Sequence, residues 1–314
     1  MGRPAVAVVG GGEWGLALAA AAARTGGLTL LLSRRAGVEL PPGVTLARDE
    51  AEVGERARLL VLAAPSGVTR DVARSLGAHV DGRHLIAHGV RGLVGEAMET
   101  ISDVVRSETP VRRLAALGGP VLASDLLAGR PSVMVCGSRY PEVNRALRDA
   151  FTCATLRLYP TDDLLGLEWA SALVGCLAIG VGYARGVGLG PGLLASVIVR
   201  GVGEAARLAA AAGGSERTLL GLAGYGDLLA SIAQIERPEV RLGEALAAGK
   251  ALDEALASAG QRVEAATLAE RVVVWAERRG VRAPIFTAIA RGILAGRAGD
   301  ALVQELMTGP AGEA

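Results

Sequence analysis

Short apolar runs alternate with helical patterns along the first half of the chain. The runs lie at 5–9, 28–32, 59–63, 85–87, 114–117, 132–136 and 156–159, and Gly, Pro or charged residues bound several of them. An alanine-rich stretch at 16–24, between the first two runs, predicts a helix. Strands that alternate with helices are typical of βαβ units, so we predict a parallel sheet with covering helices over residues 1–160.

The second half of the chain follows a different pattern. Beyond Pro160 the strand signals stop, and long stretches rich in Ala and Leu take over. Glycines at 186–192, 213–214, 224–226 and 260 interrupt these stretches and are expected to end helices. The uncharged run 170–184 is shorter than the roughly 20 residues that span a bilayer, which favours a helix buried in a protein core. We therefore predict an all-helical domain over residues 161–314.

The composition narrows the class of protein. Hydrophobic residues make up 51% of the chain but aromatic ones only 3%, so Leu, Val and Ala must form the core. A net charge of +1 lacks the basic footprint of nucleic-acid or membrane-surface proteins. Three widely spaced cysteines (Cys136, Cys153 and Cys176) form neither a disulfide framework nor a zinc site. We expect a cytoplasmic protein that binds no metal and no nucleic acid and does not insert into a membrane.

A glycine-rich turn follows the first predicted strand. Residues 10–15 read GGGEWG, which fits the pattern G-x-G-x-x-G at the start of a predicted helix. Gly10 allows the tight turn, Gly12 lets the backbone approach a pyrophosphate, and Gly15 lets the helix pack closely on the strand. The alternative is a turn without a ligand, but the position between strand and helix favours a Rossmann-type dinucleotide-binding domain. Glu13 and Trp14 join the candidate cofactor residues, with packing as the alternative role of Trp14.

Two arginines follow the second predicted strand. An NAD site would offer Asp or Glu to the ribose hydroxyls here, whereas this chain reads Ser33, Arg34 and Arg35. Paired guanidiniums suit the 2′-phosphate, so NADP(H) is favoured over NAD(H); two solvated surface arginines are the alternative. Pro65 and Ser66, which follow the run 59–63, are expected to line the cofactor cleft at the carboxyl edge of the sheet.

Further motifs follow in order along nearly the whole chain. They are GGGEWG at 10–15, LPPGVT at 40–45, VLAAPS at 61–66, GGP at 118–120, the segment 168–180, RG at 200–201 with Glu204, LAGYGDL at 222–228, VE at 263–264 and PI at 284–285. The set resembles that of NAD(P)-dependent glycerol-3-phosphate dehydrogenases. This resemblance implies an α/β protein: a Rossmann-type sheet domain, then a helical substrate and dimerisation domain like the C-terminal domain of 6-phosphogluconate dehydrogenase. It also implies an oxidoreductase that reduces dihydroxyacetone phosphate to glycerol 3-phosphate.

The resemblance implies cofactor contacts at three further positions. His88 aligns with a lysine beside the nicotinamide, and an imidazole can transfer protons near neutral pH. Ala123 and Glu264 align with other cofactor contacts. The alternatives are a sheet-edge histidine at 88 and a surface carboxylate at 264.

The resemblance places the substrate beside Gly119, Asp227 and Arg237. Asp227 and His88 are the candidate catalytic residues, and Arg237 is the candidate anion ligand. Asp227 follows a glycine and precedes an apolar run, so it could instead cap a helix.

The chain departs from the family at its central cations. A Lys-Asn pair aligns with Val174 and Gly175, an Arg-Asn pair aligns with Pro238 and Glu239, and Lys250, the only lysine, lies in a predicted loop. Lysine catalysis at Val174 is therefore ruled out.

Two functions stay open. The first is a reductase of dihydroxyacetone phosphate or a related small substrate, phosphorylated or not, that uses His88 and Asp227. The second is a catalytically inactive NADP(H)-binding sensor or partner protein. A scaffold that has lost the cofactor is disfavoured by the intact glycine turn. The apolar helical half is compatible with a homodimer.

Overall fold

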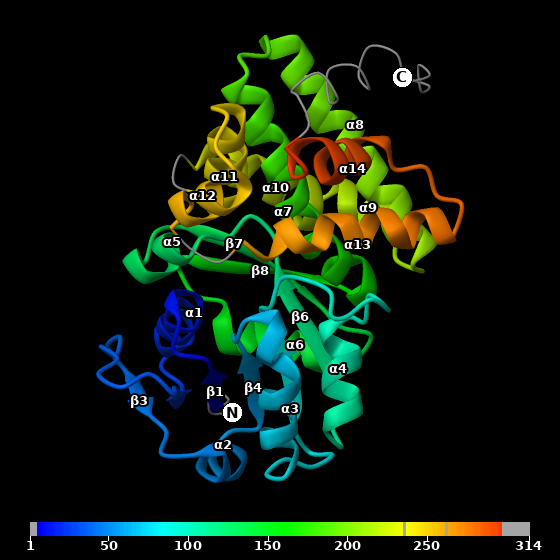
Figure 1. Cartoon of the computed structure of the whole chain (residues 1–314). Coiled ribbons are helices and arrows are strands. Elements are labelled where there is room, and N and C mark those ends of the chain that lie inside the picture. The colour runs from blue at the N-terminus through cyan, green and yellow to red at the C-terminus, as the bar shows by residue number, and fades with distance from the viewer. Residues whose placement is uncertain (1–4, 235–236, 261–262, 297–314) are drawn as a thin grey trace. The chain divides into compact units, whose positions relative to one another are not determined.

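The computed structural model of the chain describes residues 5–234, 237–260 and 263–296 and divides into two compact units (Figure 1). The first comprises Met1–Gly95 and Glu99–Glu168 and contains the sheet. The second comprises Glu96–Met98 and Trp169–Ala314 and is helical in its described part. The structure thus has the predicted α/β architecture with a helical C-terminal part.

The first unit is built on an eight-stranded sheet with the order β3-β2-β1-β4-β5-β6-β7-β8. The strands are β1 (Val6–Val9), β2 (Thr29–Leu32), β3 (Val44–Leu46), β4 (Leu59–Leu62), β5 (Leu85–His88), β6 (Leu114–Gly118), β7 (Ser132–Gly137) and β8 (Leu156–Thr161). All seven predicted apolar runs form strands, because strands covered on both faces need continuous apolar sequence. The eighth strand, β3, escaped prediction since it has three residues, of which two are exposed.

One strand pair contradicts the predicted parallel sheet. β7 pairs antiparallel with β6, whereas the other neighbours are parallel. The connection between these two strands contains only the short helix α5 (Ala123–Ala128). A helix of six residues rises about 9 Å. The chain therefore re-enters the sheet from the edge at which β6 ended.

Helices and a buried core support the sheet. The helical elements of this unit are α1 (Glu13–Ala23), α2 (Glu50–Arg56), η1 (Ser66–Val68), α3 (Thr69–Gly77), α4 (Ile101–Glu108), α5 and α6 (Pro141–Phe151). Side-chain caps begin two of them: Asp49 accepts from the N–H of Glu52, and Thr100 accepts from the N–H of Asp103. Ala17, Ala19, Ala21 and Ala22 of α1 are buried in the same apolar cluster as Phe151 of α6. Small side chains let α1 lie close to the strands.

The second unit contains the longest helices. Its elements are α7 (Leu164–Gly186, which begins in the first unit), α8 (Pro191–Ala211), α9 (Glu216–Leu220), η2 (Leu222–Gly226), α10 (Asp227–Ala233), α11 (Pro238–Ala247), α12 (Leu252–Ser258), α13 (Glu264–Arg278), α14 (Pro284–Thr287) and η3 (Ala288–Ile293). Gly186 ends α7, and Gly213 and Gly260 follow helix ends with positive φ, as predicted. The expected stop at 224–226 is wrong, because these residues form the π-helix η2 that runs into α10.

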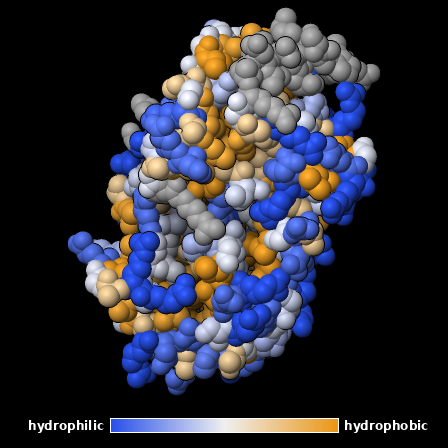
Figure 2. All heavy atoms as spheres, viewed as in Figure 1, coloured by the Kyte–Doolittle hydropathy of each residue, from blue (hydrophilic) through white to orange (hydrophobic). Residues whose placement is uncertain are grey.

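Helix α7 extends beyond the predicted apolar run. With 23 residues and a mean hydropathy of 1.9 over its most apolar window, it is long enough to cross a membrane. However, 94% of that window is buried inside the protein, as in the predicted core helix. Hydrophilic residues cover much of the face seen in Figure 2, with hydrophobic ones between them. Of the large hydrophobic side chains described, Val199 and Leu220 are the most exposed, at 61% and 56%.

Candidate functional site

The glycine turn has the geometry that a bound dinucleotide requires. β1 ends at Val9, α1 begins at Glu13, and Gly10 between them has φ +132°, which favours glycine. A Cβ at Gly10 would lie 2.6 Å from the carbonyl oxygen of Ala63, and one at Gly15 would overlap the carbonyl oxygen of Gly10. A Cβ at Gly12 would have no described atom within 4 Å. The outer glycines thus serve packing, and the middle one leaves the helix N-terminus open to a phosphate.

Most predicted cofactor residues of the first unit lie at one edge of the sheet. Val9 is in register with Leu32 and Leu62, and Leu62 is in register with His88. The residues that follow these strands share that edge: Gly10, Ser33, Pro65, Ser66 and His88 itself. The strand order also reverses between β1 and β4. Ligands of open parallel sheets bind at such a switch point, beyond the carboxyl ends of the strands.

Arg34 and Arg35 are exposed beside this edge. The N–H of Arg35 donates to Ser33 Oγ over 3.0 Å, which fixes the turn after β2. Within the described ranges neither guanidinium forms an ion pair. Both are therefore free to bind an anion.

His88 ends β5 and forms a buried polar cluster with Glu168 and Ser102. His88 Nε2 lies 3.0 Å from Glu168 Oε1, and the same oxygen accepts from the N–H of Ser102 over 2.8 Å. Ser102 Oγ lies 3.4 Å from His88 Nε2. His88 is 2% exposed and Glu168 4%. His88 Nδ1 is also buried, but it has no hydrogen-bond partner among the described residues.

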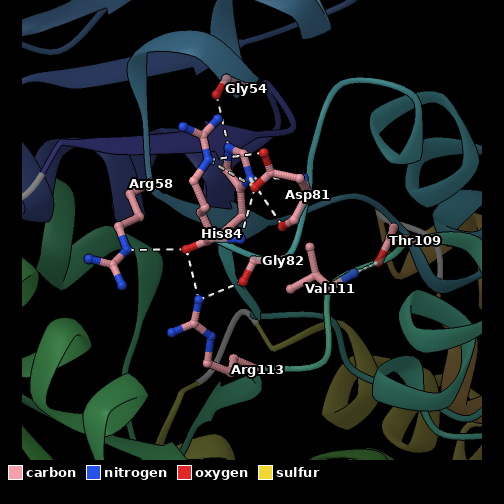
Figure 3. Close-up of polar contacts among 9 residues, drawn as sticks. Gly54, Arg58, Asp81, Gly82, His84, Thr109, Val111 and Arg113 are labelled. Carbon is pink, nitrogen blue, oxygen red and sulfur yellow. Dashed lines mark hydrogen bonds and ion pairs between the residues drawn. The ribbon is translucent and has the colours of Figure 1, made fainter.

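His84 shows what a purely structural histidine looks like in this protein (Figure 3). Its Nε2 lies 2.9 Å from the carbonyl oxygen of Gly54, and its Nδ1 lies 2.9 Å from the backbone nitrogen of Asp81. Arg58 and Arg113 bind neighbouring carbonyl oxygens of the same loop. Both ring nitrogens of His84 thus have hydrogen-bond partners within the fold, whereas Nδ1 of His88 has none among the described residues.

Trp14 lies close to His88 along the edge. A Cβ at Gly89, the residue after His88, would overlap the indole of Trp14. The Nε1 atom of Trp14 is buried and has no hydrogen-bond partner in the described part of the chain. Trp14 therefore packs against Gly89, which fits the alternative role given to it above, and its Nε1–H donor has no partner among the described residues. Its neighbour Glu13 is exposed in the first turn of α1.

Two further predicted positions follow β6. Gly119 is buried and has φ +92°, and Ala123 is the partly buried first residue of α5. Both lie just after the carboxyl end of β6, whose Ala116 is in register with His88.

Asp227 is fully buried in the second unit. The preceding residue, Gly226, has helical angles (φ −61°, ψ −44°), so the chain is already helical before Asp227. The helix-cap interpretation of Asp227 is therefore wrong. The motif LAGYGDL instead forms a π-helix that runs into α10, a feature common at functional sites. Ser231, one turn further along, is fully buried as well.

The altered positions of the family pattern meet in the second unit. Val174 is 2% exposed, and a Cβ at Gly175 would lie 3.7 Å from Glu239 Oε1. Glu239 in turn pairs with Arg237, whose Nε lies 2.7 Å from Oε2, with the two side chains 17% and 11% exposed. The candidate anion ligand Arg237 thus has a carboxylate partner of its own. Glu264 is the partly buried first residue of α13.

Cys176, the residue after Gly175 in α7, is fully buried. The Cys176 thiol lies 3.6 Å from the carbonyl oxygen of Ala265, and burial, reinforced by the Glu239 carboxylate, raises its pKa to about 12. Among the described residues no three His, Cys, Asp or Glu side chains are placed to hold a metal ion.

Sequence reasoning missed Glu168 and Ser102. A signal for Glu168 was present: it is the one charged residue between Leu164 and Ala184. A lone carboxylate in an apolar helix needs a buried partner. Ser102 had no comparable signal, since its contribution is a backbone N–H.

Comparisons with known proteins agree with this architecture. Residues 33–144 and 163–304 match the family profiles described as NAD-dependent glycerol-3-phosphate dehydrogenase N-terminus and C-terminus. A glycerol-3-phosphate dehydrogenase (NAD(P)+) of Thioalkalivibrio sulfidiphilus is 32% identical, and the match covers 98% of each chain. One of Nitrosococcus oceani is 32% identical, covering 92% of this chain and 90% of that protein. The crystal structure of glycerol-3-phosphate dehydrogenase from Coxiella burnetii has a TM-score of 0.88 at 27% identity, covering 98% and 99% of the chains.

Proposed function

Because the chain belongs to the NAD-dependent glycerol-3-phosphate dehydrogenase family, we propose that it is a cytoplasmic NADP(H)-dependent oxidoreductase that reduces a small ketone. Dihydroxyacetone phosphate and its unphosphorylated relatives are the candidate substrates. One observation carries the proposal: an open glycine turn, two exposed arginines without an ion pair among the described residues and a buried histidine share one edge of the sheet. That combination serves both cofactor binding and proton transfer.

The residues present fit a nicotinamide dinucleotide. The N-terminus of α1 at Gly12 would face the pyrophosphate, and Arg34 and Arg35 would bind the 2′-phosphate that distinguishes NADP(H) from NAD(H). The buried donor Trp14 Nε1 and the buried nitrogen His88 Nδ1 are polar atoms that the protein leaves unused. Such atoms are rare in folded proteins and support a ligand at this edge.

The chemistry of a ketone reductase needs one proton from the protein. The bound cofactor supplies a hydride to the carbonyl carbon, and the carbonyl oxygen must then receive a proton. No ammonium group stands at Val174, and the sole lysine, Lys250, lies in a loop with Glu254 3.9 Å away. We therefore assign the proton to His88. Asp227, fully buried in the second unit, is the other candidate catalytic residue.

A catalytically inactive NADP(H)-binding protein is the second candidate. The observations that favour it are the apolar side chain of Val174 in α7 and the ion pair between Arg237 and Glu239. A phosphorylated substrate would find no ammonium group at position 174, and Arg237 already has a carboxylate partner.

The two candidates are separated by NADPH oxidation assays with dihydroxyacetone phosphate, dihydroxyacetone and other small ketones. The reductase proposal expects turnover by the wild type and a loss of about 100-fold or more in His88→Ala. His79→Ala, at an exposed histidine of the same unit, is the matched control and should keep its rate. NADPH binding without turnover of any ketone, in the wild type and in Val174→Lys, would establish the inactive alternative instead.

A further inference from the structure

We propose that Glu168 is a positioning residue that holds the His88 ring with its Nε2–H on the carboxylate, so that Nδ1 is the nitrogen offered to the substrate. The role in turnover rests on the proposed function. The state of the ring itself does not, because the contacts that set it lie within the first unit.

The contacts of one oxygen atom decide where the proton sits. Glu168 Oε1 accepts the N–H of Ser102 over 2.8 Å and lies 3.0 Å from His88 Nε2. An ionised carboxylate only accepts hydrogen bonds, so the proton between the two side chains belongs to His88 Nε2. In the neutral imidazole the other nitrogen, Nδ1, then carries a lone pair. A hydrogen bond at one ring nitrogen thus fixes the function of the other.

The carboxylate is held in place by the fold. Ser102 lies in the first turn of α4, which begins at Ile101, so its N–H is one that no helical carbonyl can satisfy. The helix N-terminus also carries partial positive charge, which favours an anion beside it. Glu168 itself is 4% exposed in the continuous helix α7. Glu168 therefore lies in one helix, α7, and the N–H that binds its carboxylate lies in another, α4.

The contrast with His84 separates a structural from a functional role. Gly54 and Asp81 use both ring nitrogens of His84, at 2.9 Å each. His88 is equally buried, yet its Nδ1 has no hydrogen-bond partner in the described residues. A fold that only needed to satisfy a buried histidine would supply two partners, as it does for His84.

The arrangement gives a balanced proton transfer. When the carbonyl carbon accepts a hydride, the electron pair of its C=O π bond forms a new O–H bond with the proton on Nδ1 of the His88 imidazolium. The N–H bonding pair stays on Nδ1, and the neutral ring regains its proton from water. A carboxylate beside Nε2 holds the ring in the orientation that the transfer needs.

NMR of protein with ¹⁵N-labelled histidine measures which ring nitrogen of His88 carries the proton. The chain has three histidines, so His79→Ala and His88→Ala assign the signals. We expect neutral His88 in the wild type to carry its proton on Nε2 and to change to a mixture of tautomers in Glu168→Ala. Glu168→Asp should retain the wild-type tautomer in part. His84, with both nitrogens bonded, should keep its signal in each variant.

A matched control excludes a general structural effect. Glu204 is also a buried carboxylate, 1% exposed, that accepts the N–H groups of Ile285 and Phe286. Glu204→Gln should lower the melting temperature yet leave the His88 signals unchanged. A proton on Nδ1 in neutral wild-type His88, or signals that move equally in Glu204→Gln and Glu168→Ala, would overturn the proposal.

Kinetics test the catalytic consequence. If His88 donates the proton, Glu168→Gln should lower kcat by about 10-fold or more while KM changes less than about threefold. An unchanged kcat in Glu168→Gln would overturn the positioning role. If no ketone is turned over by the wild type, the proposed function fails, while the tautomer measurement still decides whether Glu168 holds the ring.

Discussion

The proposed preference for NADP(H) rests on Arg34 and Arg35. We expect the double change Arg34→Ala/Arg35→Ala to weaken NADPH binding and to leave NADH binding nearly unchanged, because only NADPH carries the 2′-phosphate. Both side chains are exposed and have no ion pair in the described part of the chain, so the cofactor competes with water alone.

The structure sets the size of the effect. Exposed ion pairs contribute up to about 1 kcal/mol each, and two arginines on one phosphate therefore give about 2 kcal/mol. That free energy corresponds to roughly a 30-fold rise in the Kd of NADPH. The effect should shrink as salt is raised, since the Debye length falls to about 10 Å at 0.1 M.

Isothermal titration calorimetry with both cofactors measures the selectivity. Arg58→Ala is the matched control, since Arg58 lies before β4, at the other end of that strand from the cofactor edge, and donates to the carbonyl oxygen of Arg83. If the double variant weakens NADPH and NADH equally, or weakens neither, the assignment of the 2′-phosphate to these arginines is refuted.

Three further predictions concern packing, thiols and acid stability. Gly15→Ala should abolish NADPH binding by calorimetry, since its Cβ would overlap the Gly10 carbonyl; retained affinity would contradict the turn geometry. Native protein should react with a thiol reagent at Cys153 alone. Burial alone would raise the pKa of Cys153, but its hydrogen bonds with Thr155 leave that pKa lowered. Burial raises the pKa of Cys136 to about 11. Fast labelling of Cys136 would contradict this. The pKa of Glu52 is lowered to about 2 by hydrogen bonds from the Arg48 N–H and the Arg56 and Arg48 side chains. The ionised Glu52 carboxylate thus stabilises the fold above about pH 4.5, and this contribution is lost towards pH 2. The urea midpoint of Glu52→Gln should therefore fall less on acidification than that of the wild type. Equal dependence of the two midpoints on pH would refute this role of Glu52.

The sheet was predictable because its strands are local and apolar. Gly, Pro or charged residues bound several of the buried runs, and the glycine turn stands between the first strand and helix. Residues 5–15 therefore carry their own structural information. The antiparallel β7 was not predictable, since strand direction depends on where the chain re-enters the sheet.

The candidate site was only half visible in the sequence. Gly10, Ser33 and His88 could be assigned to one edge because parallel strands end together. The partner of His88 could not, because Glu168 is 80 residues away and reaches the ring only through the path of α7. The surroundings of Asp227 also could not be predicted, since a π-helix stands where the glycines at 224–226 were expected to end a helix.

The oxidation of NADPH by the wild-type protein in the presence of small ketones, beginning with dihydroxyacetone phosphate, tests the proposed function most directly. We expect saturable, ketone-dependent turnover that is lost in His88→Ala and preserved in His79→Ala. Turnover that survives His88→Ala undiminished, or NADPH binding with no turnover of any ketone, would contradict the proposed function.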